Sequence, residues 1–219
     1  MDTPVSIDAV RAHPALFVYL DAANAHLRSL GYTEHGRRHA GIVSHNACRV
    51  LAVLEHPART QELAEIAGLL HDIGNVVNRE QHGPIGALMA KDLLLELGLG
   101  YDELAPIMNA IGNHEEQRGH TSGPIAAALV LADKADVHRS RVQEPDPAKY
   151  DIHDRVNSAA TESSLIVEDT TVTLDLTIDT TIASVMEYFE IFLARMVMCR
   201  QAAEVLDCRF ALRINQFVL

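Results

Sequence analysis

Over the first two thirds of the chain, hydrophobic residues recur every three or four positions, as they do in helices with one buried face. Local signals agree with this pattern: Thr60 can cap one such segment, and Pro84 and Pro124 suit the first turns of two others. The pattern predicts helices over residues 7–30, 34–54, 61–72, 84–98, 102–113 and 124–142.

After Val142 the pattern changes. A polar, proline-bearing connection over residues 143–151 is followed by two stretches in which apolar and β-branched residues alternate with polar ones. These stretches, 164–169 and 171–178, predict an antiparallel hairpin. A helical pattern over 181–207 and a further alternating stretch over 209–218 complete the chain. We therefore expect a mainly α protein, with a helical domain over residues 1–150 and a β-β-α-β appendage over 151–219 that packs on it.

Composition narrows the classes of partner. The chain has 219 residues, 48% of them hydrophobic, and carries 30 acidic against 18 basic residues, a formal net charge of −12. An acidic protein repels phosphate backbones, so we expect no nucleic-acid polymer as a partner. The longest apolar run, residues 125–132, is far shorter than the ~20 residues that span a bilayer, so no membrane segment is expected.

The three cysteines indicate the compartment. Cys48, Cys199 and Cys208 are scattered and lack the spacing of a structural zinc site. This usage favours free thiols in a reducing compartment. The first ten residues do not form the apolar segment of a signal peptide, so a cytoplasmic location is expected.

Imidazole and carboxylate groups recur near the ends of the predicted helices. His71 and Asp72 end the third helix, and further candidates fall on four other elements. The whole set is His39, His71, Asp72, His82, His114 and Asp133. Helix ends in a bundle can converge on one cavity, and this mixture of nitrogen and oxygen ligands suits a divalent metal ion.

The order of these residues and the text around them resemble the HD-domain superfamily of metal-dependent phosphohydrolases. The matching text is "RHAGIV" at 38–43, "AGLLHDIG" at 67–74, "HGPIGA" at 82–87 and "ALVLADKAD" at 128–136. The resemblance covers residues 30–142 and implies an HD-type helical bundle. Because several separated motifs occur in one order, it is more specific than a single His-Asp pair.

The resemblance also implies a ligand set. His39, His71, Asp72 and Asp133 would hold one ion, as in the superfamily at large. His82 and His114 would hold a second ion, as in its two-metal branch, with Asp72 bridging the two. The cofactors would then be two divalent ions, with manganese, iron, magnesium, zinc and nickel all open. The alternative is that His82 and His114 are surface residues and one ion binds.

Two metal ions can bind a bridging hydroxide as the nucleophile and clamp the attacked phosphoryl group. The leaving oxygen also needs a proton donor. His35 stands four residues before His39 and is similar in position to the general acid of the related cyclic-nucleotide phosphodiesterases. His35 is therefore the candidate general acid, with an exposed histidine at a helix start as the alternative.

Substrate phosphate requires cationic or hydrogen-bonding partners. Lys134 directly follows a candidate ligand and is assigned to the catalytic set, while Arg38, Asn75, Arg79 and Arg139 are the candidate substrate contacts. Further cations near the motifs are Arg37, Arg118 and Arg141. Many superfamily members carry a lysine where this chain has Asn75, which leaves the mode of phosphate binding open.

The leading hypothesis is a phosphohydrolase that acts on a small phosphorylated metabolite or nucleotide. The first alternative is a di-iron oxygenase of the same superfamily, because the same ligand types suit iron. The second alternative is a metal-bearing ligand sensor without catalysis. The C-terminal appendage could cover the site, or it could form a homodimer interface through an edge strand or the late helix.

Overall fold

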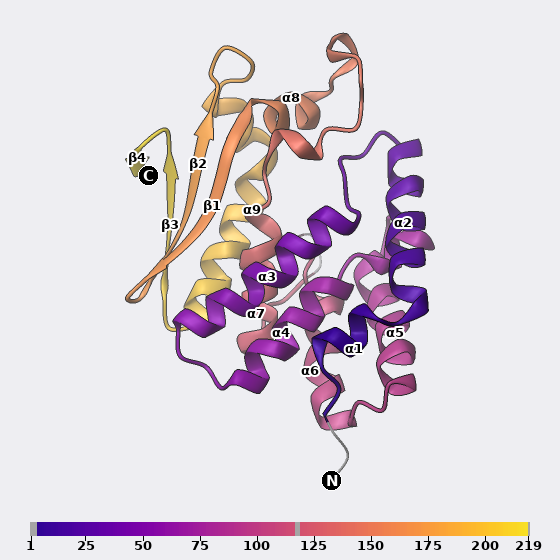
Figure 1. Ribbon diagram of the computed structural model, residues 1–219. Coiled ribbons are helices and arrows are strands. Elements are labelled where there is room, and N and C mark those ends of the chain that lie inside the picture. The colour runs from indigo at the N-terminus through magenta and orange to yellow at the C-terminus, as the bar shows by residue number, and fades with distance from the viewer. Residues whose placement is uncertain (1–3, 117–118, 219) are drawn as a thin grey trace.

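A helical bundle makes up the larger part of the molecule, and a small sheet lies along one side of it (Figure 1). The computed structural model describes residues 4–116 and 119–218. The bundle contains α1 (Ile7–Arg11), α2 (Pro14–Ser29), α3 (Arg37–Val53), α4 (Ala58–Leu70), α5 (His82–Glu96), α6 (Tyr101–Gly112) and α7 (Gly123–Lys134), with the 3-10 segments η1 (Ile73–Val76), η2 (Arg139–Arg141) and η3 (Pro147–Lys149). The remaining elements are α8 (Ile152–Ala159), β1 (Ala160–Glu168), β2 (Thr171–Ile178), α9 (Val185–Val205), β3 (Arg209–Ile214) and β4 (Phe217–Val218). The expected mainly α fold class is confirmed.

Helix α7 is the central element of the core. Every residue from Ile125 to Lys134 is buried. The helix packs against α3, α4 and α6 on the bundle side and against α9 on the side of the sheet. Its many alanines allow these neighbours to approach closely. The charged residues at its C-terminal end, Asp133 and Lys134, therefore lie inside the molecule.

The predicted first helix, 7–30, is divided in two. His13 has an extended backbone, and its Nδ1 accepts a hydrogen bond from the backbone N–H of Ala15. The cause is Pro14, because a proline disfavours the helical conformation of the residue before it. The chain therefore ends α1 at Arg11 and begins α2 at Pro14.

The predicted sixth helix, 124–142, is too long by eight residues, since α7 ends at Lys134. The chain then turns back toward α3, where Asp136 binds the side chains of Arg38 and His39. The third predicted helix, 61–72, corresponds to α4, which begins at Ala58. Thr60 therefore lies inside α4 and does not cap it. Helix α8 was not predicted; the Asp151 side chain caps its start by accepting from the N–H of Asp154 at 2.8 Å.

The C-terminal elements form one sheet in the order β1-β2-β3-β4. The predicted hairpin is confirmed, since β1 and β2 pair antiparallel. Helix α9 carries the chain across so that β3 pairs parallel with β2. The predicted last strand, 209–218, is interrupted at Asn215 and Gln216, which have φ values of 48° and 73° and turn the chain into β4.

Helix α9 lies between the sheet and the bundle, so the expectation that the C-terminal elements pack on the helical part agrees with the contacts of α9 with α7 (Figure 1). The domain boundary at residue 150 stays a prediction. The homodimer also stays a prediction. Helix α9 exposes the apolar side chains of Met186, Leu193 and Val197, which a partner could cover. Among the described residues, no helix is both long enough and apolar enough to span a bilayer.

Candidate metal centre

Two glycines bring the elements of the site into close contact. A Cβ on Gly68 of α4 would lie 2.7 Å from the Cα of Ser44 in α3, so only glycine allows this approach of the two helices. A Cβ on Gly74 in η1 would lie 2.1 Å from the backbone oxygen of His82 at the start of α5. These glycines stand on either side of His71 and Asp72, and they place this pair beside the histidines of α3 and α5.

All six predicted ligand residues lie in one buried cluster, and four of them (Asp72, His82, His114 and Asp133) line a small cavity. Their relative exposure lies between 0 and 8%. His39 comes from the first turn of α3, His71 and Asp72 from the end of α4, and His82 from the first residue of α5. His114 follows α6, and Asp133 lies in the last turn of α7. The possibility that His82 and His114 are surface residues is wrong, because each is 2% exposed.

The two carboxylate oxygens of Asp72 face different histidines. Oδ2 lies 3.3 Å from Nε2 of His71 and 3.6 Å from Nε2 of His39. Oδ1 lies 3.3 Å from Nε2 of His82 and 4.0 Å from Nε2 of His114. Asp72 therefore stands between two groups of ligand atoms, one on each side of its carboxylate.

Each of the four imidazoles is oriented by an acceptor at its other nitrogen. Nδ1 of His39 donates to Oδ2 of Asp136 at 2.6 Å, and Nδ1 of His71 donates to the backbone oxygen of Gly68 at 2.8 Å. Nδ1 of His82 and Nδ1 of His114 face the backbone oxygens of the residues three positions before them, at 3.0 Å and 2.6 Å. With the proton held on Nδ1, each Nε2 would present its lone pair to a metal ion, in exchange for the Nε2 proton where the ring carries one.

The cavity atoms meet the requirements of a cation. Nε2 of His39, Nε2 of His71 and Oδ2 of Asp72 are buried and have no hydrogen-bond partner among the described residues. Three overlapping triads place one ligand atom per residue within 4.8 Å of the others: His39, His71 and Asp72; His71, His114 and Asp133; and Asp72, His82 and His114. Unpaired buried polar atoms are costly, and a divalent metal would satisfy them. The cluster is therefore able to bind a metal ion.

Electrostatics agree with this assignment. Burial raises the pKa of Asp72 and Asp133, but neighbouring positive groups outweigh it, so both pKa values lie well below the ordinary range. For Asp72 these groups begin with His71, and for Asp133 with Lys134. Burial lowers the pKa of His82, yet hydrogen bonds to Asp72 and Glu115 raise it to about 9. The carboxylates thus remain anionic and attract positive charge into the cavity.

His114 differs from His82. Burial, followed by the charges of His82 and His71, lowers the pKa of His114 to about 3. Its ring is therefore neutral at physiological pH, the form in which histidine binds metals. Nε2 of His114 lies 3.0 Å from Nε2 of His82.

His35 lies at the cavity although it precedes α3 and is not part of it. Its ring centroid is 5.4 Å from that of His39, and its Nδ1 donates to the backbone oxygen of Thr33 at 2.6 Å. The side chain is buried, so the alternative of an exposed histidine is wrong. Burial, reinforced by Arg141, holds the pKa of His35 well below its usual value. Its role as general acid stays a prediction.

Two predicted cations lie at the cavity. Lys134 is buried, and its Nζ lies 2.7 Å from Oδ2 of Asp133 and 3.0 Å from Oε1 of Glu116. Burial lowers the pKa of Lys134, but these two carboxylates raise it above its ordinary value, so the ammonium stays charged. Arg79 lines the same cavity and donates from Nη1 to Oδ1 of Asn75 at 3.3 Å.

Asn75 is fully buried and faces the metal ligands. Its Nδ2 donates to Oδ1 of Asp72 at 2.9 Å and to the backbone oxygen of the same residue at 3.0 Å. These bonds orient the Asp72 carboxylate and use the amide donor that the sequence suggested for substrate. A contact of Asn75 with substrate stays a prediction.

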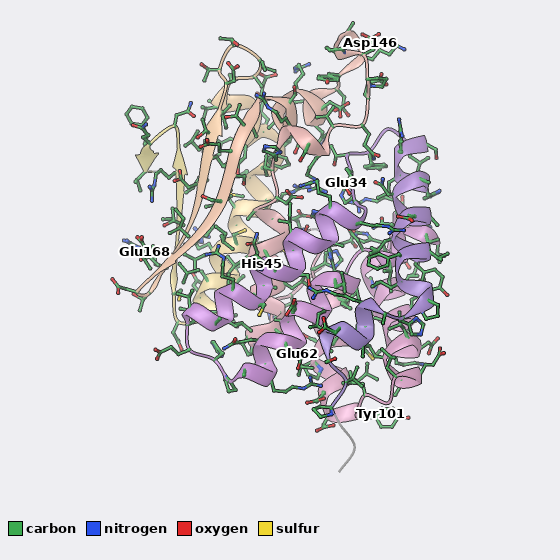
Figure 2. The ribbon with its side chains drawn as sticks, viewed as in Figure 1. Glu34, His45, Glu62, Tyr101, Asp146 and Glu168 are labelled. Atoms are coloured by element: carbon green, nitrogen blue, oxygen red, sulfur yellow. The ribbon has the colours of Figure 1, made fainter. Side chains whose placement is uncertain are left out.

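Of the other predicted cations that the structure describes, Arg141 lines the cavity and Arg37, Arg38 and Arg139 do not. Arg38 pairs with Glu34 and Asp136 and lines a separate cavity near β1, and Arg139 is exposed on η2. Arg37 pairs with Asp21 at the surface. Arg118 lies outside the described residues. The guanidinium of Arg141 binds the backbone oxygens of Glu34 and Asp136. Figure 2 labels Glu34, in the loop before α3, and the exposed His45 of α3.

Sequence reasoning missed four residues of the site. Asp136 orients His39, and its only signal was an acid three positions after Asp133. Glu115 and Glu116 directly follow His114 and line the cavity. Arg195 of α9 also lines it, and Nε of Arg195 lies 2.9 Å from Oε1 of Glu116. No motif near Arg195 pointed to the site, because it lies 81 positions along the chain from His114 in a helix with an ordinary amphipathic sequence.

Comparison with known proteins agrees with this geometry. Residues 29–154, more than half of the chain, match the model of the family described as HD domain. The chain belongs to the HD domain family. In this HD domain protein the matched segment contains all six predicted ligand residues, together with His35 and Asp136.

A curated relative also matches the chain. The uncharacterized protein MJ1020 of Methanocaldococcus jannaschii is 30% identical over 162 residues, which cover 64% of this HD domain chain and 61% of that protein. The chain therefore matches less than two thirds of the length of this relative.

Proposed function

We propose that this protein is a divalent-metal-dependent phosphohydrolase that acts on a small phosphorylated metabolite or nucleotide and uses two metal ions. The observation that carries the proposal is the position of Asp72. Its Oδ2 faces His39 and His71, and its Oδ1 faces His82 and His114. A carboxylate between two histidine pairs suits a bridging ligand of a binuclear site.

The charges around the cavity support an anionic substrate. Its lining residues include four carboxylates (Asp72, Asp133, Glu115 and Glu116) and four cations (Arg79, Lys134, Arg141 and Arg195). These charges balance, so each divalent ion makes the loaded site more positive by two charges. A site of this kind favours a phosphate ester over a neutral substrate.

When bound, the ions activate a water molecule and neutralise charge on the phosphoryl oxygens. The protein supplies the remaining functions. Asp136 holds the His39 ring in the orientation that directs Nε2 into the cavity, and Lys134 keeps a positive charge beside Asp133. His35 borders the cavity, and its Nδ1 donates to the backbone oxygen of Thr33. Because burial keeps the ring neutral, its Nε2 first takes a proton from the attacking water and then gives it to the leaving oxygen.

The test begins with the metal content of the purified protein. Phosphate release is then measured on a panel of sugar phosphates and nucleotides with manganese, iron or magnesium, under anaerobic conditions. We expect release without oxygen, and loss of nearly all activity in His71→Ala and in Asp72→Ala. Activity that survives both substitutions would contradict the metal assignment.

The same experiment separates the alternatives. Oxygen uptake with bound iron and no anaerobic phosphate release would indicate a di-iron oxygenase. Tight binding of a phosphorylated compound without turnover, under every metal, would indicate a ligand sensor. Either result would contradict the proposed phosphohydrolase.

A further inference from the structure

A second cavity adjoins the metal-ligand cavity. It has a volume of about 380 Å³, and His35, Arg79 and Arg195 line both cavities. Its other walls come from the loop between α2 and α3 and from the start of α8. A molecule bound at the metal ligands can therefore extend past these three side chains into the second cavity, which we call the outer cavity.

Arg195 is held in a fixed orientation at the boundary of the two cavities. Its Nε lies 2.9 Å from Oε1 of Glu116, and its guanidinium carbon lies 4.4 Å from the ring centroid of Phe192. Neither Nη atom of Arg195 has a hydrogen-bond partner among the described residues, and the side chain is 23% exposed. Because Nε pairs with Glu116 and the face of the guanidinium stacks on Phe192, the two Nη groups are the ones left to bind an anion.

Arg79 provides a second cation at the same boundary. Its Nη1 is 3.3 Å from Oδ1 of Asn75, and its guanidinium carbon lies 5.4 Å from the ring centroid of Tyr32. Its Nη2 has no hydrogen-bond partner within the described part of the chain. Arg79 and Arg195 come from segments 116 positions apart in the sequence, and they meet only because α9 packs against the bundle.

The outer cavity offers groups that bind hydroxyls. Tyr32, Thr33, Asp151 and His153 line it. Oδ1 of Asp151 caps α8, whereas no hydrogen bond to its Oδ2 or to the His153 ring is found among the described residues. A carboxylate and an imidazole can accept from and donate to the hydroxyls of a sugar or polyol. An apolar group of the same size would make none of these bonds.

Taken with the proposed phosphohydrolase activity, on which this inference rests, these contacts define a substrate class. We propose that Arg195 and Arg79 bind the phosphoryl group of a phosphomonoester, and that the outer cavity receives its hydroxyl-bearing organic group. Arg195 lies outside the residues that match the HD domain model, so this contact is a property of this chain and its C-terminal elements. The C-terminal elements thus complete the substrate site.

The first experiment compares Arg195→Ala with two controls, using the manganese-loaded full-length protein. Arg195→Ala is expected to raise KM for a sugar phosphate about 10- to 100-fold, with bound manganese unchanged, because it removes a charge-assisted contact to phosphate. Arg200→Ala, an exposed site on the same helix, is expected to leave KM unchanged. Binding of inorganic phosphate, measured by calorimetry, is expected to weaken in Arg195→Ala and not in Arg200→Ala.

Glu116→Gln distinguishes a phosphate contact from a purely structural ion pair. It removes the carboxylate that holds Nε of Arg195 but keeps the guanidinium. If Arg195 binds phosphate, Glu116→Gln raises KM much less than Arg195→Ala does. Equal effects of the two variants on KM and on phosphate binding would overturn the role of Arg195.

The second experiment tests the organic group. Glucose 6-phosphate is compared with cyclohexylmethyl phosphate, which has a ring of similar size without the hydroxyls. We expect kcat/KM to be at least about tenfold higher for the sugar phosphate, since its hydroxyls can hydrogen-bond to polar groups of the cavity and the ring of the analogue cannot. Asp151→Asn keeps an N-cap residue for α8 and removes the charge, so it is expected to reduce this preference without unfolding the helix.

The outcomes separate this inference from the proposed function. If the wild-type protein hydrolyses phosphate esters but shows no preference for hydroxyls and no change in KM in Arg195→Ala, the inference fails and the function stands. If the wild-type protein hydrolyses no phosphate ester under any metal, both fail.

Discussion

Nδ1 of His39 donates a hydrogen bond of 2.6 Å to Oδ2 of Asp136, and this bond directs Nε2 of His39 at the other ligands. Asp136 is itself held by Arg38 at 2.7 Å and is almost fully buried. The carboxylate of Asp136 thus affects the candidate metal site through the His39 ring and does not itself line the cavity. Such partners of metal-binding histidines control ring orientation and ligand basicity.

Asp136→Asn is therefore expected to weaken metal binding by about 10- to 100-fold, because an amide is a weaker acceptor for the Nδ1 proton. The measurement is manganese affinity by calorimetry, with far-UV circular dichroism to confirm the helical content. Asp8→Asn, at an exposed carboxylate of α1, is the control and is expected to bind manganese like the wild type. An unchanged affinity in Asp136→Asn would show that Asp136 does not orient His39.

His82→Ala is expected to reduce the bound metal from two ions per chain to one. His82 faces Oδ1 of Asp72, whereas the atoms of His39 and His71 lie on the Oδ2 side and are left intact. The number of metal ions per chain is measured by inductively coupled plasma mass spectrometry, after the protein has been loaded with metal and dialysed to remove unbound ions. His45→Ala, at an exposed position of α3, should keep both ions. One ion in the wild type would contradict the binuclear site.

Gly74→Ala is expected to destabilise the protein by about 2 kcal/mol or more, because the new Cβ would lie 2.1 Å from the backbone oxygen of His82 and would force α5 away from η1. Metal binding should fall as well, since Asp72 and His82 separate. The free energy of unfolding is measured by urea denaturation.

Gly41→Ala is the matched control for this substitution. Gly41 lies inside α3, and a Cβ there would meet nothing within 4 Å. Because alanine is more favourable than glycine inside a helix, the free energy of unfolding of this variant is expected to rise by about 0.5–1 kcal/mol. Equal stability of the two alanine variants would mean that the close approach at Gly74 is not required.

The cysteines allow a test of the core. Cys199 is buried, and burial raises its pKa to about 12, whereas Cys48 is only half-buried. At pH 8 Cys48 is expected to react with Ellman's reagent in the native protein, and Cys199 only after denaturation. Stability should also fall as pH rises above about 9, because the unfolded state then loses the Cys199 proton while the folded state keeps it. Rapid reaction of Cys199 in the native protein would contradict the packing of α9 on α7.

Local signals predicted the individual elements better than their ends. The helix over residues 34–54 and the β1–β2 hairpin depend on periodicity alone and were recovered, apart from their ends. The predicted continuation of the sixth helix failed at Lys134, because the segment after it turns back to bind α3 through Asp136. That interaction joins residues 97 positions apart, and no local pattern reports it.

The ligand set was recognisable from the chain itself. His39, His71, Asp72, His82, His114 and Asp133 stand near helix ends within short, distinctive motifs, and the structure brings all six together. The substrate contacts were predicted less well. Arg38 and Asn75 are used in holding the ligands, since their partners Asp136 and Asp72 are metal-site residues.

The amino-acid sequence by itself determined the helical character of the bundle, through the spacing of its hydrophobic residues, and indicated the residues that can hold a metal, through short motifs that resemble the HD-domain superfamily. Only the tertiary structure decided which oxygen of Asp72 faces which histidines, and that Arg195 borders the same cavity. The physical reason is that these relationships depend on how buried apolar faces pack. Helix α9 lies at the cavity because its buried side packs against α7. This packing places Arg195 at the edge of the cavity.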